Sequence, residues 1–243
     1  MTAEAEVYRP QNSVRVVTAT SLFDGHDASI NIFRRILQST GAEVIHLGHN
    51  RSVQEIVDAA IEEDAQGIAV SSYQGGHVEY FKYMIDLLNE AEAPHVKVFG
   101  GGGGVIVPEE IRELEAYGVA KIYSPEDGAR LGLQGIINHM VQTMDFARGH
   151  VTDIDFSRLT TAHKTVVANL ITTVEQAHAS QNGHLARLRA ELQSRRRDRP
   201  APVVGITGTG GSGKSSLTDE LIQRLLLDFQ DLRVAIISAD PSR

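Results

Sequence analysis

The sequence predicts an α/β protein with a five-stranded parallel sheet, a helical linker and the start of a second α/β domain. Three observations carry this prediction. Short apolar runs alternate with amphipathic stretches of helical length from residue 14 to about residue 144. The strand-type pattern then disappears over residues 151–199, which are polar and helical in character. A new apolar run at 202–206 leads directly into a glycine-rich loop and another helical pattern.

The apolar runs have the length and composition of parallel strands that are buried on both faces. They are residues 14–19, 43–47, 67–71, 96–99 and 120–123. Helices are expected between and after them, at 29–39, 52–64, 78–91, 108–117 and 125–146. Ser52 with Glu55 three residues later forms a capping box, and Pro108 and Pro125 stand near helix starts. This order predicts a flavodoxin-like, Rossmann-type domain.

The remaining segments follow from the same pattern. We predict a tail at 1–13, the sheet domain at 14–148, a helical linker at 149–200 and a second, truncated domain at 201–243, whose apolar runs 202–206 and 232–238 are expected to be strands. The linker holds two polar helical segments, 157–180 and 183–197, and the first has an apolar stripe that needs a packing partner. That stripe runs through Leu159, Val166, Val167, Leu170 and Val174. The arginine-rich run 195–199 is interpreted as a charged hinge, with a small nucleic-acid patch as the alternative.

Composition narrows the function classes. The net charge of -8 gives no overall basic field for nucleic acid, and aromatic residues make up only 5% of the chain. No cysteine is present, which excludes disulfides, thiolate metal sites and a catalytic thiol. The first twelve residues lack the apolar core of a signal peptide, and no apolar run is long enough to span a membrane. We therefore expect a cytoplasmic protein that binds neither nucleic acid nor membrane.

Residues 208–215 match the phosphate-binding loop pattern G-x-x-x-x-G-K-[ST] in full. Glycines let successive backbone N–H groups converge on phosphate oxygens, and the start of the following helix adds partial positive charge. Lys214 is expected to reach the outer phosphates, and the Ser215 hydroxyl to bind Mg²⁺. The alternative is a glycine-rich turn without a ligand. The candidate nucleotide-binding residues are Gly208, Gly210, Gly211, Ser212, Gly213, Lys214, Ser215 and Ser216.

Three loops are predicted to leave the carboxyl edge of the first sheet, where open α/β sheets bind ligands. They hold Asp24 to Ser29, Ser71 to Gly76, and Gly100 to Gly104. Five consecutive glycines are unfavourable for folding because they lose much chain entropy. We interpret the glycine run as a place where a large, flat cofactor approaches the backbone closely.

Asp24 and His26 form a specific chemical pair within the first loop. A carboxylate that accepts a proton from one ring nitrogen fixes the tautomer and makes the other nitrogen a better metal ligand. No Cys, Glu or His cluster near them could complete an all-protein metal site. A metal already held by a macrocycle needs only one protein ligand. The alternative is an ordinary surface histidine in a turn.

These loops resemble the cobalamin-binding domains of the acyl-CoA mutases and methionine synthase. The matching entries are Asp24, His26, Ser71 and the glycine run ending in Gly103 and Gly104. The resemblance implies that His26 is the lower cobalt ligand, that Asp24 orients it, and that the displaced nucleotide tail lies beside the Ser and Gly loops. Ser29 stands where the pattern has Gly, and Tyr73 where it has Leu. The expected cofactor-binding residues are Asp24, Gly25, His26, Asp27, Ser29, Ser71, Tyr73, Gly103 and Gly104.

The phosphate loop and the segment 234–242 are similar to the GTPase chaperones of cobalamin-dependent mutases, whose second strand ends in Asp-Pro-Ser. The resemblance implies GTP rather than ATP, and it makes Asp240 a candidate Mg²⁺ residue. An ordinary Asp-Pro turn is the alternative. The segment that specifies the base is expected beyond Arg243.

A cobalamin domain, a helical linker and a chaperone-type GTPase domain occur in this order in the fused isobutyryl-CoA mutases. The resemblance implies adenosylcobalamin, GTP with Mg²⁺, and interconversion of isobutyryl-CoA and n-butyryl-CoA, with the acyl-CoA bound by a C-terminal barrel absent from this chain. It also implies a homodimer. We therefore expect the amino-terminal part of such an enzyme, without the catalytic residues of the mutase. Two alternatives stay open: a cobalamin carrier or regulatory module joined to a P-loop NTPase, and a plain P-loop ATPase.

Overall fold

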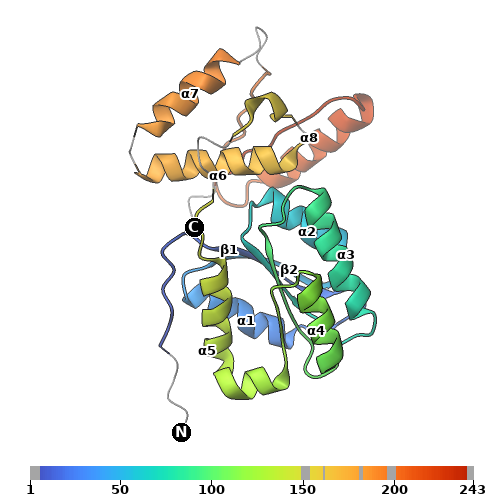
Figure 1. Cartoon of the computed structure of the whole chain (residues 1–243). Coiled ribbons are helices and arrows are strands. Elements are labelled where there is room, and N and C mark those ends of the chain that lie inside the picture. The colour runs from blue at the N-terminus through green and yellow to red at the C-terminus, as the bar shows by residue number, and fades with distance from the viewer. Residues whose placement is uncertain (1–5, 149–153, 161, 181–182, 196–200, 240–243) are drawn as a thin grey trace. The chain divides into compact units, whose positions relative to one another are not determined.

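A five-stranded parallel sheet organises the first part of the chain in the computed structural model (Figure 1). The strand order is β2-β1-β3-β4-β5. Every predicted strand of the first domain overlaps one of these strands, so the predicted fold class is confirmed. The bounds are β1 (Arg15–Ser21), β2 (Glu43–Arg51), β3 (Gly67–Ser71), β4 (Lys97–Gly101) and β5 (Lys121–Tyr123).

The structure describes residues 6–148, 154–160, 162–180, 183–195 and 201–239, and it separates the chain into two units, residues 1–191 and 192–243. The helices of the first unit are α1 (Ala28–Ser39), α2 (Val53–Glu62), α3 (His77–Glu90), α4 (Pro108–Tyr117), α5 (Pro125–Met144) and α6 (Lys164–Ser180). A short 3₁₀ turn, η2 (Phe156–Arg158), precedes α6, and α7 (His184–Ser194) follows it. None of the helices in these described ranges is both long and apolar enough to cross a membrane.

Helices cover both faces of the sheet (Figure 1). Helices α1 and α5 lie on one face, and α2, α3 and α4 lie on the other. Neighbouring residues of a strand point to opposite faces, so Val16 packs with the α1/α5 core and Val17 with the α2/α3/α4 core. Both are fully buried. This two-sided burial explains why the strands are continuous apolar runs rather than alternating ones.

Local signals fix several helix ends. The Ser52 hydroxyl accepts a hydrogen bond from the Glu55 N–H (3.3 Å), and the Glu55 carboxylate accepts one from the Ser52 N–H (2.9 Å), so the predicted capping box at α2 is confirmed. Helix α5 is shorter than predicted and is kinked at Gly132, whose φ of 63° and ψ of 175° are not helical. Glycine tolerates that conformation at little cost.

Helix α6 packs on α2 within the first unit, at the amino edge of the sheet. Lys164 pairs with Glu62 (2.8 Å), and the Thr165 hydroxyl donates to the Ala91 carbonyl (3.0 Å). Just before α6, Arg158 forms two hydrogen bonds with the Glu92 carboxylate (2.8 and 2.9 Å). Four residues of the predicted apolar stripe lie on α6, which packs on α2 of the same chain, whereas Leu159 lies outside this helix, after η2.

The second unit contains α8 (Lys214–Asp228), which follows the glycine-rich loop as predicted. The runs expected as strands, 202–206 and 232–238, are not strands in the described residues of this unit. They are mostly exposed: Val203 is 94% and Ile237 is 95% accessible. A strand requires a neighbour for its backbone groups and a partner for its apolar face, and the described residues give these runs neither.

Candidate functional site

The carboxyl edge of the first sheet gathers the residues singled out in the first unit. Strands β1, β3 and β4 are neighbours in the sheet, so the loops that follow them meet at one edge. Asp24 and His26 come from the loop between β1 and α1, Tyr73 from the loop between β3 and α3, and Gly103 from the loop after β4. The sheet thus brings together residues that are far apart along the chain, as the sequence pattern predicted.

Asp24 holds His26 by two hydrogen bonds. Its Oδ1 accepts from His26 Nδ1 (2.7 Å) and from the His26 backbone N–H (2.9 Å). The Asp24 side chain is fully buried, whereas the His26 side chain is 68% exposed. Because Nδ1 donates its proton to the carboxylate in this hydrogen bond, the neutral imidazole carries its free lone pair on Nε2, which has no hydrogen-bond partner among the described residues. The pair therefore presents one oriented imidazole nitrogen outward.

The environment of Asp24 keeps its carboxylate ionised. Burial by itself would raise the pKa of Asp24, but the hydrogen bonds from the Tyr73 N–H (2.5 Å) and from His26 outweigh it and lower that pKa below its ordinary value. An ionised Asp24 is the form that accepts the hydrogen bond from His26 Nδ1. The predicted orienting role of Asp24 thus has the contacts that it needs.

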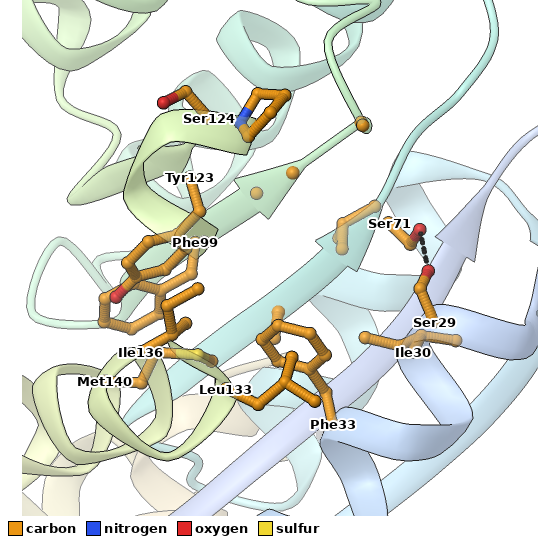
Figure 2. Close-up of a pocket in the computed structure, with 18 of the residues that line it drawn as sticks. Ser29, Ile30, Phe33, Ser71, Phe99, Tyr123, Ser124, Leu133, Ile136 and Met140 are labelled. Atoms are coloured by element: carbon orange, nitrogen blue, oxygen red, sulfur yellow. Dashed lines mark hydrogen bonds between the residues drawn. The ribbon is translucent and has the colours of Figure 1, made fainter. Parts of the chain in front are cut away.

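A cavity of about 290 Å³ opens beside these loops, between the sheet and helices α1 and α5 (Figure 2). Apolar side chains form most of its wall, including Phe33 of α1, Phe99 of β4 and Met140 of α5. At one side, the hydroxyls of Ser29 and Ser71 are hydrogen bonded at 3.0 Å, as the dashed line in Figure 2 marks. A mostly apolar cavity with a few polar groups is the usual form of a small-molecule site.

Sequence reasoning missed much of this wall. Tyr123, Ser124 and Pro125 line the cavity where β5 ends. Because open α/β sheets bind ligands at the carboxyl ends of their strands, these residues could have been predicted in the same way as the other loops. The α5 residues Ile136 and Met140 carried no such signal, because they look like ordinary core positions of an amphipathic helix.

At three positions of the glycine loop, the protein's own packing explains the glycine without the close approach of a cofactor. A Cβ at Gly100 would collide with Phe81 and Ile122, one at Gly102 with the Ser72 carbonyl, and one at Gly103 with the Tyr73 ring. Gly103 and Gly104 also have positive φ angles of 56° and 95°. The protein's own side chains and backbone therefore account for much of the glycine run.

The other predicted residues of this edge lie in the loop before α1. The Asp27 N–H donates to the Gly25 carbonyl (3.0 Å), and Asp27 precedes the first turn of α1. A side chain at Gly25 would meet nothing within 4 Å. Within the described residues, no group of three or more His, Cys, Asp or Glu side chains is placed to hold a metal ion. His26 therefore belongs to no such group among the described residues.

The phosphate loop of the second unit has the expected turn. Gly211 and Gly213 adopt positive φ angles of 76° and 82°, which favour glycine. The Ser212 hydroxyl and the Lys214 ammonium both donate to the Thr209 carbonyl at 2.8 Å. Gly208, Gly210, Ser215 and Ser216 are exposed along the loop and the first turn of α8. Asp240, the predicted Mg²⁺ residue, lies outside the described residues.

Two known families match different parts of the chain. Residues 14–131 match the B12 binding domain family, and residues 167–243 match the family described as methylmalonyl Co-A mutase-associated GTPase MeaB. The second match begins within α6, so it includes part of the helical segment as well as the phosphate loop.

Individual relatives agree with both matches. The chain is 58% identical over 241 residues to the fused isobutyryl-CoA mutase of Geobacillus kaustophilus, covering 98% of this chain and 22% of that protein. It is 61% identical over 235 residues to the fused isobutyryl-CoA mutase of Cupriavidus metallidurans, covering 96% of this chain and 21% of that protein. The chain thus spans about a fifth of the length of these relatives. It is also 32% identical over 112 residues to the 2-hydroxyisobutanoyl-CoA mutase small subunit of Aquincola tertiaricarbonis, covering 46% of this chain and 81% of that protein.

Proposed function

The chain belongs to the fused isobutyryl-CoA mutase family, and on this premise we propose that it binds adenosylcobalamin at the carboxyl edge of its first sheet and GTP with Mg²⁺ at its phosphate loop. The observation that carries the cobalamin proposal is the buried Asp24 that fixes His26 and leaves Nε2 facing outward. His26 is the proposed cobalt ligand, and Asp24 orients it.

The adjoining cavity is the proposed place for the nucleotide tail that His26 displaces. Its apolar wall suits a flat aromatic group, and Ser29 and Ser71 supply hydroxyls at its side. Gly25, Asp27, Gly103 and Gly104 shape the loops around it, and Tyr73 stands at their junction. When bound, adenosylcobalamin supplies a cobalt–carbon bond that breaks homolytically to give a radical. The residues of this chain bind and orient that group.

Absorbance spectra test the cobalt ligand. In the wild-type protein an imidazole should replace the cofactor's own base as the lower cobalt ligand, and the spectrum of bound cobalamin should differ in His26→Ala, which lacks that ligand. His178→Ala is a matched control, because His178 is an exposed histidine of α6 far along the chain from these loops. Identical spectra for the wild-type and His26→Ala proteins would exclude cobalt ligation by His26.

Nucleotide binding is proposed for Lys214, the hydroxyl of Ser215 and the backbone of Gly208, Gly210, Gly211, Ser212, Gly213 and Ser216, with Asp240 as a second Mg²⁺ residue. The MeaB match supports GTP as the nucleotide. Titrating a fluorescent GTP analogue with Mg²⁺ into the wild-type and Lys214→Ala proteins tests this site. The Lys214→Ala variant should lose binding and keep its cobalamin spectrum. Loss of the cobalamin spectrum in a folded Lys214→Ala protein would contradict two independent sites.

For the protein as a whole, we propose the interconversion of isobutyryl-CoA and n-butyryl-CoA in the cytoplasm by a homodimer, with the acyl-CoA held in a C-terminal barrel. The names of the relatives in the fused mutase family support this reaction. The 243-residue chain with adenosylcobalamin should then give no isomerisation of isobutyryl-CoA, as monitored by gas chromatography of the hydrolysed acids. Turnover by this chain alone would place the acyl-CoA site within its residues.

A further inference from the structure

Tyr73 lies where the three loops of the carboxyl edge meet. Its backbone N–H donates to Asp24 Oδ2 at 2.5 Å, opposite the oxygen that holds His26. Its ring centroid is 5.6 Å from that of His26, with the two planes tilted by 45°. Its ring also lies against Gly103, where a Cβ would collide with it, and it lines the cavity. One side chain therefore touches the imidazole, the glycine loop and the cavity wall.

The loop that carries Tyr73 is linked to the glycine loop through the buried His77 and the partly exposed Glu110. His77, only 7% exposed at the start of α3, is bonded through Nδ1 to the Gln74 carbonyl (3.2 Å) and through Nε2 to Glu110 (2.9 Å). The same Glu110 oxygen accepts from the Val107 N–H (2.9 Å), which ends the glycine loop. The loop that carries the Tyr73 ring is thus tied to the glycine loop and, through the Tyr73 N–H, to Asp24.

His26 needs this second restraint. Asp24 fixes the position of Nδ1, but a single hydrogen bond allows the ring to tilt about the line between Nδ1 and the carboxylate oxygen. The side chain is 68% exposed, so little else surrounds it. A ring packed beside the imidazole limits the tilt and so limits the directions in which Nε2 points. Neighbouring residues that orient a metal ligand in this way contribute to metal affinity.

We propose that Tyr73 is a positioning residue for His26: its ring, seated over Gly103, sets the tilt of the imidazole and thereby the share of bound cobalamin that is ligated by histidine. The aromatic ring rather than the hydroxyl carries this role, since the contacts with His26 and Gly103 are made by the ring. The inference rests on the proposed cobalamin function.

Electron paramagnetic resonance of cob(II)alamin bound to the 243-residue chain tests the proposal. With ¹⁵N-labelled histidine, ligation by the protein gives a two-line splitting, whereas a nitrogen of the cofactor itself gives three lines. The wild-type and Tyr73→Phe proteins should show the histidine pattern. Tyr73→Leu and Tyr73→Ala should reduce its share and weaken cobalamin binding by roughly ten-fold. Tyr83→Leu, at an exposed tyrosine of α3, is the matched control.

Gly103→Ala adds an independent check. In the wild-type background the new methyl group meets the Tyr73 ring, so the histidine-ligated share should fall. In the Tyr73→Ala background that collision is removed and only the positive φ remains unfavourable, so the same change should have a smaller effect. If Gly103→Ala fails to fold, as judged by circular dichroism, the Tyr73 variants still decide the question.

The outcomes separate the two proposals. Unchanged histidine ligation and cobalamin affinity in Tyr73→Leu and Tyr73→Ala, together with loss of ligation in His26→Ala, would overturn the role of Tyr73 alone. Unchanged ligation in His26→Ala would overturn the cobalamin function on which this inference rests.

Discussion

The His26 loop and the phosphate loop each join an apolar run to a helix, but they differ in the structure around them. The His26 loop follows β1, which is paired on both sides and has fully buried residues such as Val17 and Ala19. The phosphate loop follows residues 202–206, where Val203 and Val204 are 94% and 82% exposed. The first loop can bury a carboxylate at Asp24, whereas the second keeps its polar groups at the surface.

This difference shows that a local motif supplies the residue types and the turn, whereas a sheet brings residues of separate loops together. Both loops carry the residue types that their chemistry needs. Only the sheet brings residues from other loops to the first one, as when the Tyr73 N–H bonds to Asp24. In the phosphate loop, the side chains of Ser212 and Lys214 bond within the loop, to Thr209. A local motif can form its turn alone, but a site assembled from distant segments depends on the sheet.

The largest expected effect tests this comparison directly. Ile68→Ala, at a fully buried position of β3, should destabilise the first unit by about 2 to 5 kcal/mol because it leaves a cavity in the core. Ile237→Ala, at a position 95% exposed, should change stability by about 0.5 kcal/mol or less. Chemical denaturation followed by circular dichroism measures both. Equal effects would show that the second unit has a core of its own in solution.

Asp24→Asn should have the next largest effect. An amide replaces one of the two carboxylate oxygens with a donor, so an N–H group of either Tyr73 or His26 then faces a donor, and cobalamin affinity should fall roughly 10- to 100-fold. The lowered pKa of Asp24 means that its contribution to stability is present above its ordinary pKa and is lost as pH falls through the folded value. Asp228→Asn, at an exposed site, is the control. Unchanged affinity in Asp24→Asn would contradict the orienting role.

Asp145→Asn tests the hydrogen bonds that tie the N-terminal segment to the end of α5. Asp145 accepts hydrogen bonds from the Tyr8 hydroxyl (2.7 Å) and from the backbone N–H groups of Gln11 and Asn12 (2.8 Å each), and they lower its pKa to about 2 although burial opposes them. The variant should be roughly 1 to 2 kcal/mol less stable at neutral pH, a figure reduced for solvent screening.

The pH dependence of that difference has a definite sign. Because the folded pKa of Asp145 is depressed, its contribution is present above the unfolded value of 3.8 and is lost as pH falls toward about 2. The stability gap between the wild-type and Asp145→Asn proteins, measured by urea unfolding from pH 6 to pH 2, should therefore close at the acid end. A constant gap would assign the effect to packing rather than charge.

Lys214→Ala should have the smallest effect on stability, about 0.5 kcal/mol or less, because within the described residues its ammonium bonds only to a carbonyl of its own loop. Its effect should appear only with nucleotide: GTP with Mg²⁺ should raise the melting temperature of the wild-type protein and not that of the variant. Thermal unfolding with and without nucleotide measures this. A shift of equal size in both proteins would remove Lys214 from the phosphate site.

The positions of most elements were predictable because each carried a local signal. The capping box at Ser52, the prolines that begin α4 and α5, and the apolar runs of the strands are visible in short windows of sequence. Asp24 and His26 were also predictable, since they are two residues apart and their hydrogen bond is local. The unformed strands at 202–206 and 232–238 show the limit of such windows, because pairing depends on a neighbour that the window does not contain.

The sequence by itself determined the order of the strands and helices, the Asp24–His26 pair and the turn of the phosphate loop, because each depends on residues close together in the chain. Only the tertiary structure decided the cavity wall from α5, the docking of α6 on α2 and the place of Tyr73 between His26 and Gly103. These contacts join segments tens of residues apart, and the packing of helices on the sheet selects them. The residues of the α5 wall and of the α6–α2 contact carry no local pattern that distinguishes a site from an ordinary core.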